Sequence, residues 1–180
     1  QIEGFFNIPV DHLRALPLFA DYLREKNLED GVLVASDEGA VKRSKQLADR
    51  LDLPLAIIFQ RRVGRDMKEP MQIVGDVEGR IPIMIEDVIS TAGTIYNAVD
   101  VLTRSGAQPE VYLCATHAIL AGPALERLKR EEIREVIVTN TIPVAPERML
   151  EKFTVLSAAP LLAEAIRRIH MNQSVSILFT

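Results

Sequence analysis

The chain has 180 residues, of which 48% are hydrophobic and 26% are charged, with a formal net charge of −4. This composition is typical of a globular protein with a sizeable core, and the slight acidity gives no electrostatic case for binding nucleic acid or an anionic membrane. No apolar run approaches the roughly 20 residues that a membrane helix needs. Cys114 is the single cysteine, which excludes an intrachain disulfide and fits a cytoplasmic location.

The N-terminus reads "QIEGFFNIPV", without an initial Met and without the basic-then-apolar pattern of a signal peptide. Its apolar residues precede any helix or turn signal. One interpretation is an ordinary terminal segment that folds onto its own core. We favour another, in which the chain is a fragment that continued from something upstream.

Apolar runs rich in β-formers alternate with helical patterns along the chain. Strands are predicted at 31–36, 53–59, 80–87, 110–119 and 135–140, and helices at 40–51, 94–105, 122–130 and 160–170. Strands that are apolar throughout and separated by helices indicate a parallel sheet covered on both faces. The predicted fold class is therefore α/β, a three-layer and mostly parallel twisted sheet.

The helix predicted at 40–51 has one apolar face. Its spacing puts Val41, Ser44, Leu47, Ala48 and Leu51 inward, and Lys42, Arg43, Lys45 and Asp49 outward. The segment 60–79 breaks the alternation, because it is polar and holds several charges, then a proline followed by two glycines. It reads as a long loop, and loops of that length in compact domains are usually functional or mobile.

The stretch 81–94, "IPIMIEDVISTAGT", carries the strongest chemical signal. In a parallel α/β sheet, ligands bind beyond the carboxyl ends of the strands, and Glu86 and Asp87 are predicted to lie at such an end. The turn at 90–94 then opens a helix that Ser90 or Thr91 can cap. Gly93 lets the backbone approach a ligand. Such a turn is a phosphate cradle, because the first N–H groups of a helix are unpaired.

The two carboxylates of this stretch supply a different chemistry. They can accept hydrogen bonds from sugar hydroxyls, or hold Mg²⁺ through water. The stretch therefore suits a sugar phosphate, although a simply capped helix with solvated acids explains the same pattern. It is not a Walker loop, because the GxxxxGK[ST] spacing is absent.

"IMIEDVISTAGT" resembles the ribose-phosphate signature of the type I phosphoribosyltransferase fold. Further stretches resemble one branch of it, the ribose-phosphate diphosphokinases or PRPP synthetases: "QIEGFFNIPVDHL", "IVGDVEGR" (73–80), "CATHAILAGPALER" (114–127), "VTNTIP" (138–143), "LSAAPLLAEAIRRIH" (156–170) and "SVSILF" (174–179). The agreement is collinear over essentially the whole chain. It is more specific than any single motif.

The resemblance implies a reaction that transfers diphosphate from ATP to ribose 5-phosphate, giving PRPP and AMP, with Mg²⁺ as cofactor. It implies that the 5-phosphate is held by Ser90, Thr91, Ala92, Gly93 and Thr94, and the ribose hydroxyls by Glu86 and Asp87. Asp37 matches a metal-linked aspartate, and Arg62 matches a catalytic arginine on the loop at 60–79. Ser174, Ser176 and Phe179 match an inter-subunit regulatory site for inorganic phosphate or ADP, in a homo-oligomer.

The chain also departs from the family's pattern. Gln60 stands where the family has a catalytic lysine, "ASDEGA" (35–40) replaces Pro-Asp-x-Gly-Gly, and Ser90 stands where aspartate is common. The chain resembles only the second, C-terminal half of a family member. We therefore divide it into a remnant shared with a missing half (1–15), a ribose-phosphate-binding domain (16–159) and a C-terminal helix and tail that pack on that half or a partner (160–180).

These departures leave three functions open. The first is the ribose-phosphate-binding half of the enzyme, which binds ribose 5-phosphate or PRPP but cannot complete the reaction alone. The second is a non-catalytic regulatory subunit, which the uncharged Gln60 favours. The third is a salvage phosphoribosyltransferase, which the shared signature permits. His117, with no metal spacing to another histidine, is expected to be a structural hydrogen-bonding residue.

Overall fold

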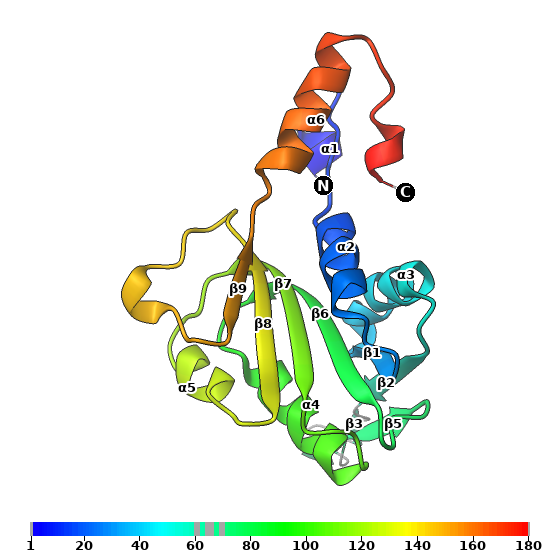
Figure 1. Ribbon diagram of the computed structural model, residues 1–180, viewed down its shortest axis with the longest axis vertical. Coiled ribbons are helices and arrows are strands. Elements are labelled where there is room, and N and C mark those ends of the chain that lie inside the picture. Colours follow the sequence, from blue (N-terminus) through cyan, green and yellow to red (C-terminus); the bar gives the residue numbers. More distant parts are fainter. Residues whose placement is uncertain (1, 60–61, 64–66, 69–70, 180) are drawn as a thin grey trace.

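A computed structural model describes residues 2–59, 62–63, 67–68 and 71–179. A seven-stranded sheet forms the centre of the protein, in the order β5-β2-β1-β6-β7-β8-β9 (Figure 1). Its strands are β1 (Gly31–Ala35), β2 (Leu55–Phe59), β5 (Gln72–Val74), β6 (Ile81–Ile89), β7 (Val111–Ala118), β8 (Ile133–Thr139) and β9 (Phe153–Leu156). Every neighbouring pair is parallel except β2 with β5. The predicted mostly parallel α/β sheet is confirmed.

Helices cover both faces of this sheet, which confirms the three layers. The described helices are α1 (Ile2–Phe5), α2 (Leu16–Lys26), α3 (Val41–Leu51), α4 (Gly93–Arg104), α5 (Ala124–Leu128) and α6 (Ala159–His170), with short 3-10 turns η1 (Glu38–Ala40), η2 (Pro146–Arg148) and η3 (Ser176–Leu178). One core cluster packs α2 and α3 on the sheet, around Phe19 and Leu47. The other packs α4 and α5 on the opposite face, around Leu102 and Leu128.

The order of the strands places a topological switch point between β1 and β6. From β1 the chain moves outward to β2, whereas from β6 it moves the other way through β7 and β8 to β9. The two strands pair in parallel from Gly31↔Ile81 to Val34↔Met84. In open α/β sheets the crevice beyond the carboxyl ends at this point is the usual ligand site.

Strand β6 is longer than predicted. The acids were expected at its end, but Val88 and Ile89 continue the strand and pair with His117 and Ala118 of β7. The extension is possible because β7 itself runs that far, while β1 has already ended. Glu86 and Asp87 therefore lie where β6 is paired on one side and open on the other.

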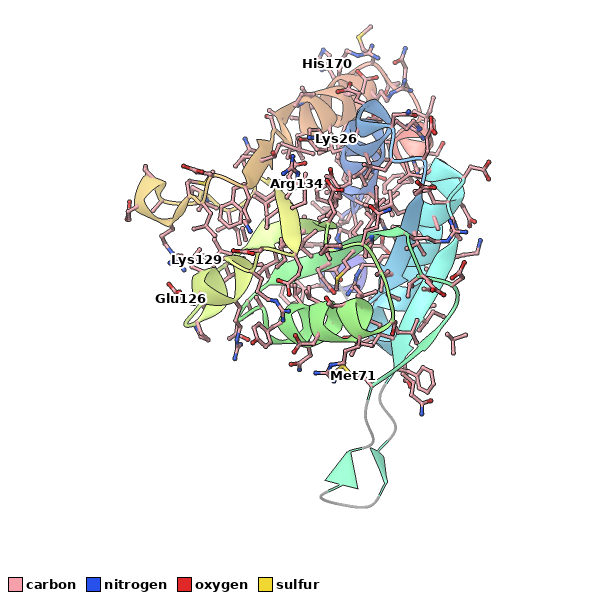
Figure 2. All side chains as sticks on the ribbon, turned by 60° about the horizontal axis from the view of Figure 1, so that its bottom comes forward. Lys26, Met71, Glu126, Lys129, Arg134 and His170 are labelled. Carbon is pink, nitrogen blue, oxygen red and sulfur yellow. The ribbon has the colours of Figure 1, made fainter. Side chains whose placement is uncertain are left out.

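The prediction of one long loop at 60–79 was wrong in part. Residues 72–74 form β5, which pairs antiparallel with β2 at the edge of the sheet. Arg62–Val63 (β3) and Met67–Lys68 (β4) form a separate two-stranded sheet, which Figure 2 shows away from the main sheet. Elements of two or three residues are too short for a hydrophobic period to reveal.

Other differences concern helices and one more strand. The helix predicted at 122–130 is shorter in the structure, where α5 has only five residues. It begins late because Gly122 has a left-handed φ of 52° and Pro123 is the N-cap. The helix α2 and the strand β9 were not predicted from the sequence. Cys114, in β7, is fully buried.

The two ends of the chain share one end of the molecule. α6 begins three residues after β9 ends, so it lies beyond the carboxyl edge of the sheet, and α1 projects to the same end in Figure 1. Large apolar side chains are exposed here, including Phe5, Leu162, Ile166 and Ile169. Among the described helices, none combines the length and hydropathy needed to cross a membrane.

Candidate functional site

A cleft of about 640 Å³ opens at the carboxyl edge of the sheet, beside the switch point. Its walls come from the segment before α2, from α3, from the ends of β6 and β7, and from the start of α6. Glu86, Asp87 and Arg43 all line it. Both predicted hydroxyl-binding acids therefore face a space large enough for a small ligand.

Arg43 binds both acids at once. Its Nη2 lies 3.0 Å from Oε2 of Glu86, and its Nη1 lies 2.8 Å from Oδ2 of Asp87. Its Nε also donates to the carbonyl of Ile85 at 3.0 Å. The prediction that Arg43 points outward was wrong, although Lys45 and Asp49 are exposed as expected. Arg43 lies in the first turn of α3, where η1 brings the helix over the open side of β6.

Glu86 is the more enclosed of the two acids. Its side chain is 12% exposed, against 74% for Asp87. Ser36, at the end of β1, donates a short hydrogen bond to Oε1 of Glu86. Burial raises the pKa of Glu86, and the hydrogen bonds from Ser36 and Arg43 offset that rise only in part. Asp87 is therefore the acid best placed to meet a ligand.

The turn at 90–94 opens α4 without a side-chain cap. We expected Ser90 or Thr91 to cap the helix, but the N-cap is Ala92, which has a left-handed φ of 55° and gives no side-chain hydrogen bond. The N–H groups of the first helical turn cannot bond within the helix. Ser90, Thr91 and Thr94 are exposed. The turn therefore offers backbone donors and hydroxyls together, which suits an anion.

Arg127 of α5 holds this turn from outside. Its Nη1 donates to the carbonyl of Thr91 at 2.9 Å, and a Cβ added to Gly93 would lie 3.3 Å from the same nitrogen. Arg127 was not predicted as a site residue, because nothing in the sequence around it indicates such a role. Only the fold brings α5 against a turn 36 residues earlier.

The acids and the turn occupy neighbouring parts of one sheet edge. Within the described residues, the lining of the cleft includes the acids but none of the residues 90–94. Val88 and Ile89 separate Asp87 from Ser90 along β6, a distance of about 10 Å at the usual strand rise. A ligand that touches both must extend along the edge from the cleft to the turn.

Asp37 lies at the same edge, directly after β1. It is exposed and is the N-cap of η1, and its Oδ1 accepts a hydrogen bond of 2.9 Å from the N–H of Ala40, the last residue of that turn. Its negative charge contributes to the raised pKa of Glu86. Over the described ranges, no group of three or more His, Cys, Asp or Glu side chains could hold a metal ion.

The other predicted residues lie elsewhere. Gln60 is outside the described residues, and for Arg62 the structure describes only its backbone, in β3. In the tail, the hydroxyls of Ser174 and Ser176 are 2.7 Å apart, and Arg50 donates to the carbonyl of Phe179 at 3.5 Å. Phe179 lines a smaller hollow against α2 and α3, which it shares with Arg14 and Arg50.

His117 makes the structural contact expected of it. Its Nδ1 is 2.8 Å from the hydroxyl oxygen of Thr141, and that hydroxyl donates to the carbonyl of Thr116 at 3.0 Å. Both His117 and Thr141 line the cleft. This bond fixes the loop after β8 against the end of β7 and so shapes one wall of the cleft.

The fold and the switch-point site define a protein of the phosphoribosyltransferase-like α/β class. The solved structure of an orotate phosphoribosyltransferase from Aeropyrum pernix, 20% identical, superposes with a TM-score of 0.52 over 83% of this chain and 75% of that one. At this identity the likeness concerns the fold alone.

The family follows from closer matches. Residues 62–180 match the family described as the phosphoribosyl synthetase-associated domain, and since they are well over half of the chain, the chain belongs to this family. It is 51% identical over 180 residues to a ribose-phosphate pyrophosphokinase of Bacillus subtilis (strain 168). The structure of a phosphoribosylpyrophosphate synthetase from Mycobacterium smegmatis, 43% identical, superposes over 96% of the chain with a TM-score of 0.85.

These matches confirm the family predicted from the sequence motifs. The chain spans 56% of the length of both of these relatives. Which half of a relative it represents stays a prediction, as does the division at residues 15 and 160.

Proposed function

We propose that this chain provides the ribose 5-phosphate site of a ribose-phosphate pyrophosphokinase. The observation that carries the proposal is the arrangement along β6, where an acid pair in a cleft is followed, after two intervening residues, by a backbone turn that opens α4. Carboxylates suit sugar hydroxyls, and a helix N-terminus suits a phosphate. The relatives' names, ribose-phosphate pyrophosphokinase, agree with a ligand that has both groups.

In the proposed complex, the exposed turn binds the 5-phosphate. Ser90, Thr91 and Thr94 supply hydroxyls, and Ala92 and Gly93 supply backbone that can approach closely. Arg127 fixes the turn through the carbonyl of Thr91. The ribose ring then lies toward the cleft, where Asp87 and, behind it, Glu86 accept hydrogen bonds from its hydroxyls.

The complete reaction transfers diphosphate from ATP. The C1 hydroxyl oxygen of ribose 5-phosphate bonds to the β-phosphorus of ATP and releases its proton to water, the bond from that phosphorus to the α-phosphate oxygen breaks, and AMP leaves with the electron pair of that bond. Positioned cations stabilise such a transfer, and we assign Arg62 to that task. Gln60, at the position of the family's lysine, carries no charge. A lost cation of this kind costs several kcal/mol in the transition state, on the order of what an oxyanion-hole donor supplies.

The residues at this edge fit Mg²⁺ in the way that substrate-bound Mg²⁺ usually binds. This ion is typically held by one or two carboxylates together with water and substrate phosphates, and not by a full protein cage. Asp37 is an exposed carboxylate close enough to the acid pair for its charge to raise the pKa of Glu86, so it would serve as such a ligand. When bound, Mg²⁺ would neutralise charge on the transferring diphosphate.

The remaining assignments extend this proposal. Ser174, Ser176 and Phe179 form a regulatory site for inorganic phosphate or ADP; two arginines, Arg14 and Arg50, line a hollow together with Phe179 and support this assignment. The exposed apolar side chains of α1 and α6 contact the rest of the protein or a second subunit of a homo-oligomer. A cytoplasmic location suits an enzyme of nucleotide biosynthesis.

Direct titration of the chain with ribose 5-phosphate tests the proposal. Calorimetry is expected to show binding that Thr94→Ala weakens, while an ATP-dependent assay shows no PRPP formation by this chain alone. Release of pyrophosphate from PRPP on adding a nucleobase would instead identify a salvage phosphoribosyltransferase. No binding of ribose 5-phosphate would overturn the proposal.

A further experiment separates the enzyme from a regulatory subunit. Gln60→Lys in the full-length protein is expected to raise the rate of PRPP formation without changing the affinity for ribose 5-phosphate. A full-length protein that stays inactive with lysine at position 60, yet changes the activity of other subunits, would favour the regulatory subunit.

A further inference from the structure

One guanidinium group joins the two acids of the site to two other elements. Arg43 uses Nη2 for Glu86, Nη1 for Asp87 and Nε for the carbonyl of Ile85, and its Nη1 also lies 3.4 Å from the carbonyl of Gly39. The side chain is 24% exposed. All three of its nitrogens are therefore engaged, and its position is set by four acceptors.

This arrangement solves a problem that adjacent carboxylates create. Neighbouring residues of a strand normally point to opposite faces, and two like charges so close together disfavour each other's ionised form. β1 pairs with β6 only as far as Met84, so the side of β6 beyond Ile85 is open to α3. Arg43 fills that opening and pairs with one oxygen of each acid.

The remaining oxygens are divided between the protein and the cleft. Oε1 of Glu86 accepts the hydrogen bond from Ser36. For Asp87, by contrast, Arg43 contacts Oδ2, and no donor among the described residues contacts Oδ1. Asp87 is 74% exposed and lines the cleft. The pair thus presents Oδ1 of Asp87 to a ligand as a fixed acceptor, while its other three oxygens are hydrogen-bonded within the protein.

We propose that Arg43 is a positioning residue for sugar recognition, which holds Glu86 and Asp87 in one fixed arrangement so that they can accept hydrogen bonds from ribose hydroxyls. This inference rests on the proposed function. Arg43 acts through the acids and does not contact the phosphate turn. Its loss should therefore weaken binding of the hydroxyl-bearing ring and leave binding of a bare phosphate unchanged.

The test compares two probes, ribose 5-phosphate and inorganic phosphate, by calorimetry on the chain. Arg43→Gln is expected to weaken ribose 5-phosphate binding about tenfold, the scale of one charge-assisted hydrogen bond, with phosphate affinity unchanged within about twofold. Arg43→Lys should restore part of the loss, because an ammonium group can meet one acid well but not both. Lys45→Gln, on an exposed position of the same helix, is the matched control and should change neither affinity.

The outcomes separate the alternatives. Unchanged ribose 5-phosphate binding by Arg43→Gln would overturn the inference, and an equal loss for both probes would show that Arg43 binds anions directly. If Arg43→Gln does not fold, the same comparison on Arg43→Lys decides, with a smaller loss confined to ribose 5-phosphate expected. A wild-type chain that binds ribose 5-phosphate no more tightly than phosphate would overturn the proposed function itself, and this inference with it.

Discussion

Two glutamates with equally enclosed side chains, Glu86 and Glu135, have pKa values shifted in opposite directions. Each side chain is 12% exposed. Glu135 lies near the beginning of β8, and Glu86 lies near the carboxyl end of β6. Burial alone would raise the pKa of Glu135, but hydrogen bonds from Thr154, Tyr22 and Lys26 outweigh it, so the pKa is lowered. For Glu86, burial outweighs its partners and the pKa is raised.

The surroundings of Glu135 explain the difference. The hydroxyls of Tyr22 and Thr154 each lie 2.5 Å from its Oε1, and Nζ of Lys26 lies 2.9 Å from Oε2. These donors come from α2 and β9, so the carboxylate ties three elements together. Figure 2 shows Lys26 near Arg134, and both line the same hollow. Three donors make Glu135 part of the framework, whereas the two donors of Glu86, Ser36 and Arg43, do not offset its burial beside the cleft.

The largest effect on ligand affinity is expected at Asp87, the exposed neighbour of Glu86. Asp87→Ala removes the exposed acceptor, and the loss of a charged hydrogen bond should lower the affinity for ribose 5-phosphate by up to about 100-fold. Titration calorimetry measures this change. Asp21→Ala, which removes an exposed acid paired with Arg24, is the control and should leave the affinity unaltered. Equal affinity of the Asp87 variant and wild type for ribose 5-phosphate would show that the acids do not bind this ligand.

The next effect concerns stability and separates the two glutamates directly. Glu135→Gln should lower the free energy of unfolding by about 2 kcal/mol, because it breaks the pair with Lys26 and leaves a hydroxyl donor without its charged acceptor. Glu86→Gln should cost less than about 1 kcal/mol, because the ionised form of Glu86 already carries a burial penalty. Urea unfolding of both variants measures the difference. Equal losses would show that the two environments are energetically alike.

The pH dependence of stability should have opposite signs for these two residues. The lowered pKa of Glu135 means that its contribution is complete above its ordinary value of 4.5 and is lost as the pH falls through the lower value of the folded state. The advantage of wild type over Glu135→Gln should therefore shrink as the solution is acidified.

Glu86 should show the reverse. Its raised pKa means that the folded state binds the proton more tightly, so wild type should gain stability relative to Glu86→Gln as the pH falls toward 4.5. Urea midpoints over a series from neutral pH to about pH 4 follow both pairs. Slopes of the same sign for the two pairs would contradict this assignment.

The smallest effect on ligand affinity is expected at the turn at 90–94, which offers backbone N–H groups to the phosphate and has no carboxylate. Gly93→Ala adds a Cβ 3.3 Å from Nη1 of Arg127, close enough that one of the two must move by a few tenths of an ångström. We expect a loss of phosphate affinity of a few-fold, on the order of 1 kcal/mol. Gly4→Ala, where nothing lies within 4 Å of the added Cβ, is the matched control. An unchanged phosphate affinity for Gly93→Ala would place the anion elsewhere.

The sequence was sufficient for the five central strands of the sheet, and it indicated the parts of the candidate site that are neighbours in the chain. Apolar runs revealed the central strands, because a parallel sheet buries them on both faces. The stretch 81–94 revealed the acids and the turn, because they are neighbours in the chain. Short elements such as β5 and β9 were not predicted, because three or four residues are too few to show a hydrophobic period.

The residues that the sequence could not reveal act across long separations. Arg43 looked like an exposed charge of an amphipathic helix, and its true partners lie 42 to 44 residues further on. Arg127 meets its turn over 36 residues. Helical spacing predicts which face is apolar, but it does not say that an arginine in the first turn will reach a neighbouring strand.

The open side of β6 has a consequence for anyone who would transplant this site into another protein. The fourteen letters from 81 to 94 look like a portable cassette, but in this fold their two acids are held by a helix that belongs to the preceding β-α unit. The smallest unit that can be moved intact contains the strands β1 and β6, the first turn of α3, and α5, whose Arg127 holds the turn at 90–94. A graft of residues 81–94 alone would transfer the residues of the site without the contacts that fix their geometry.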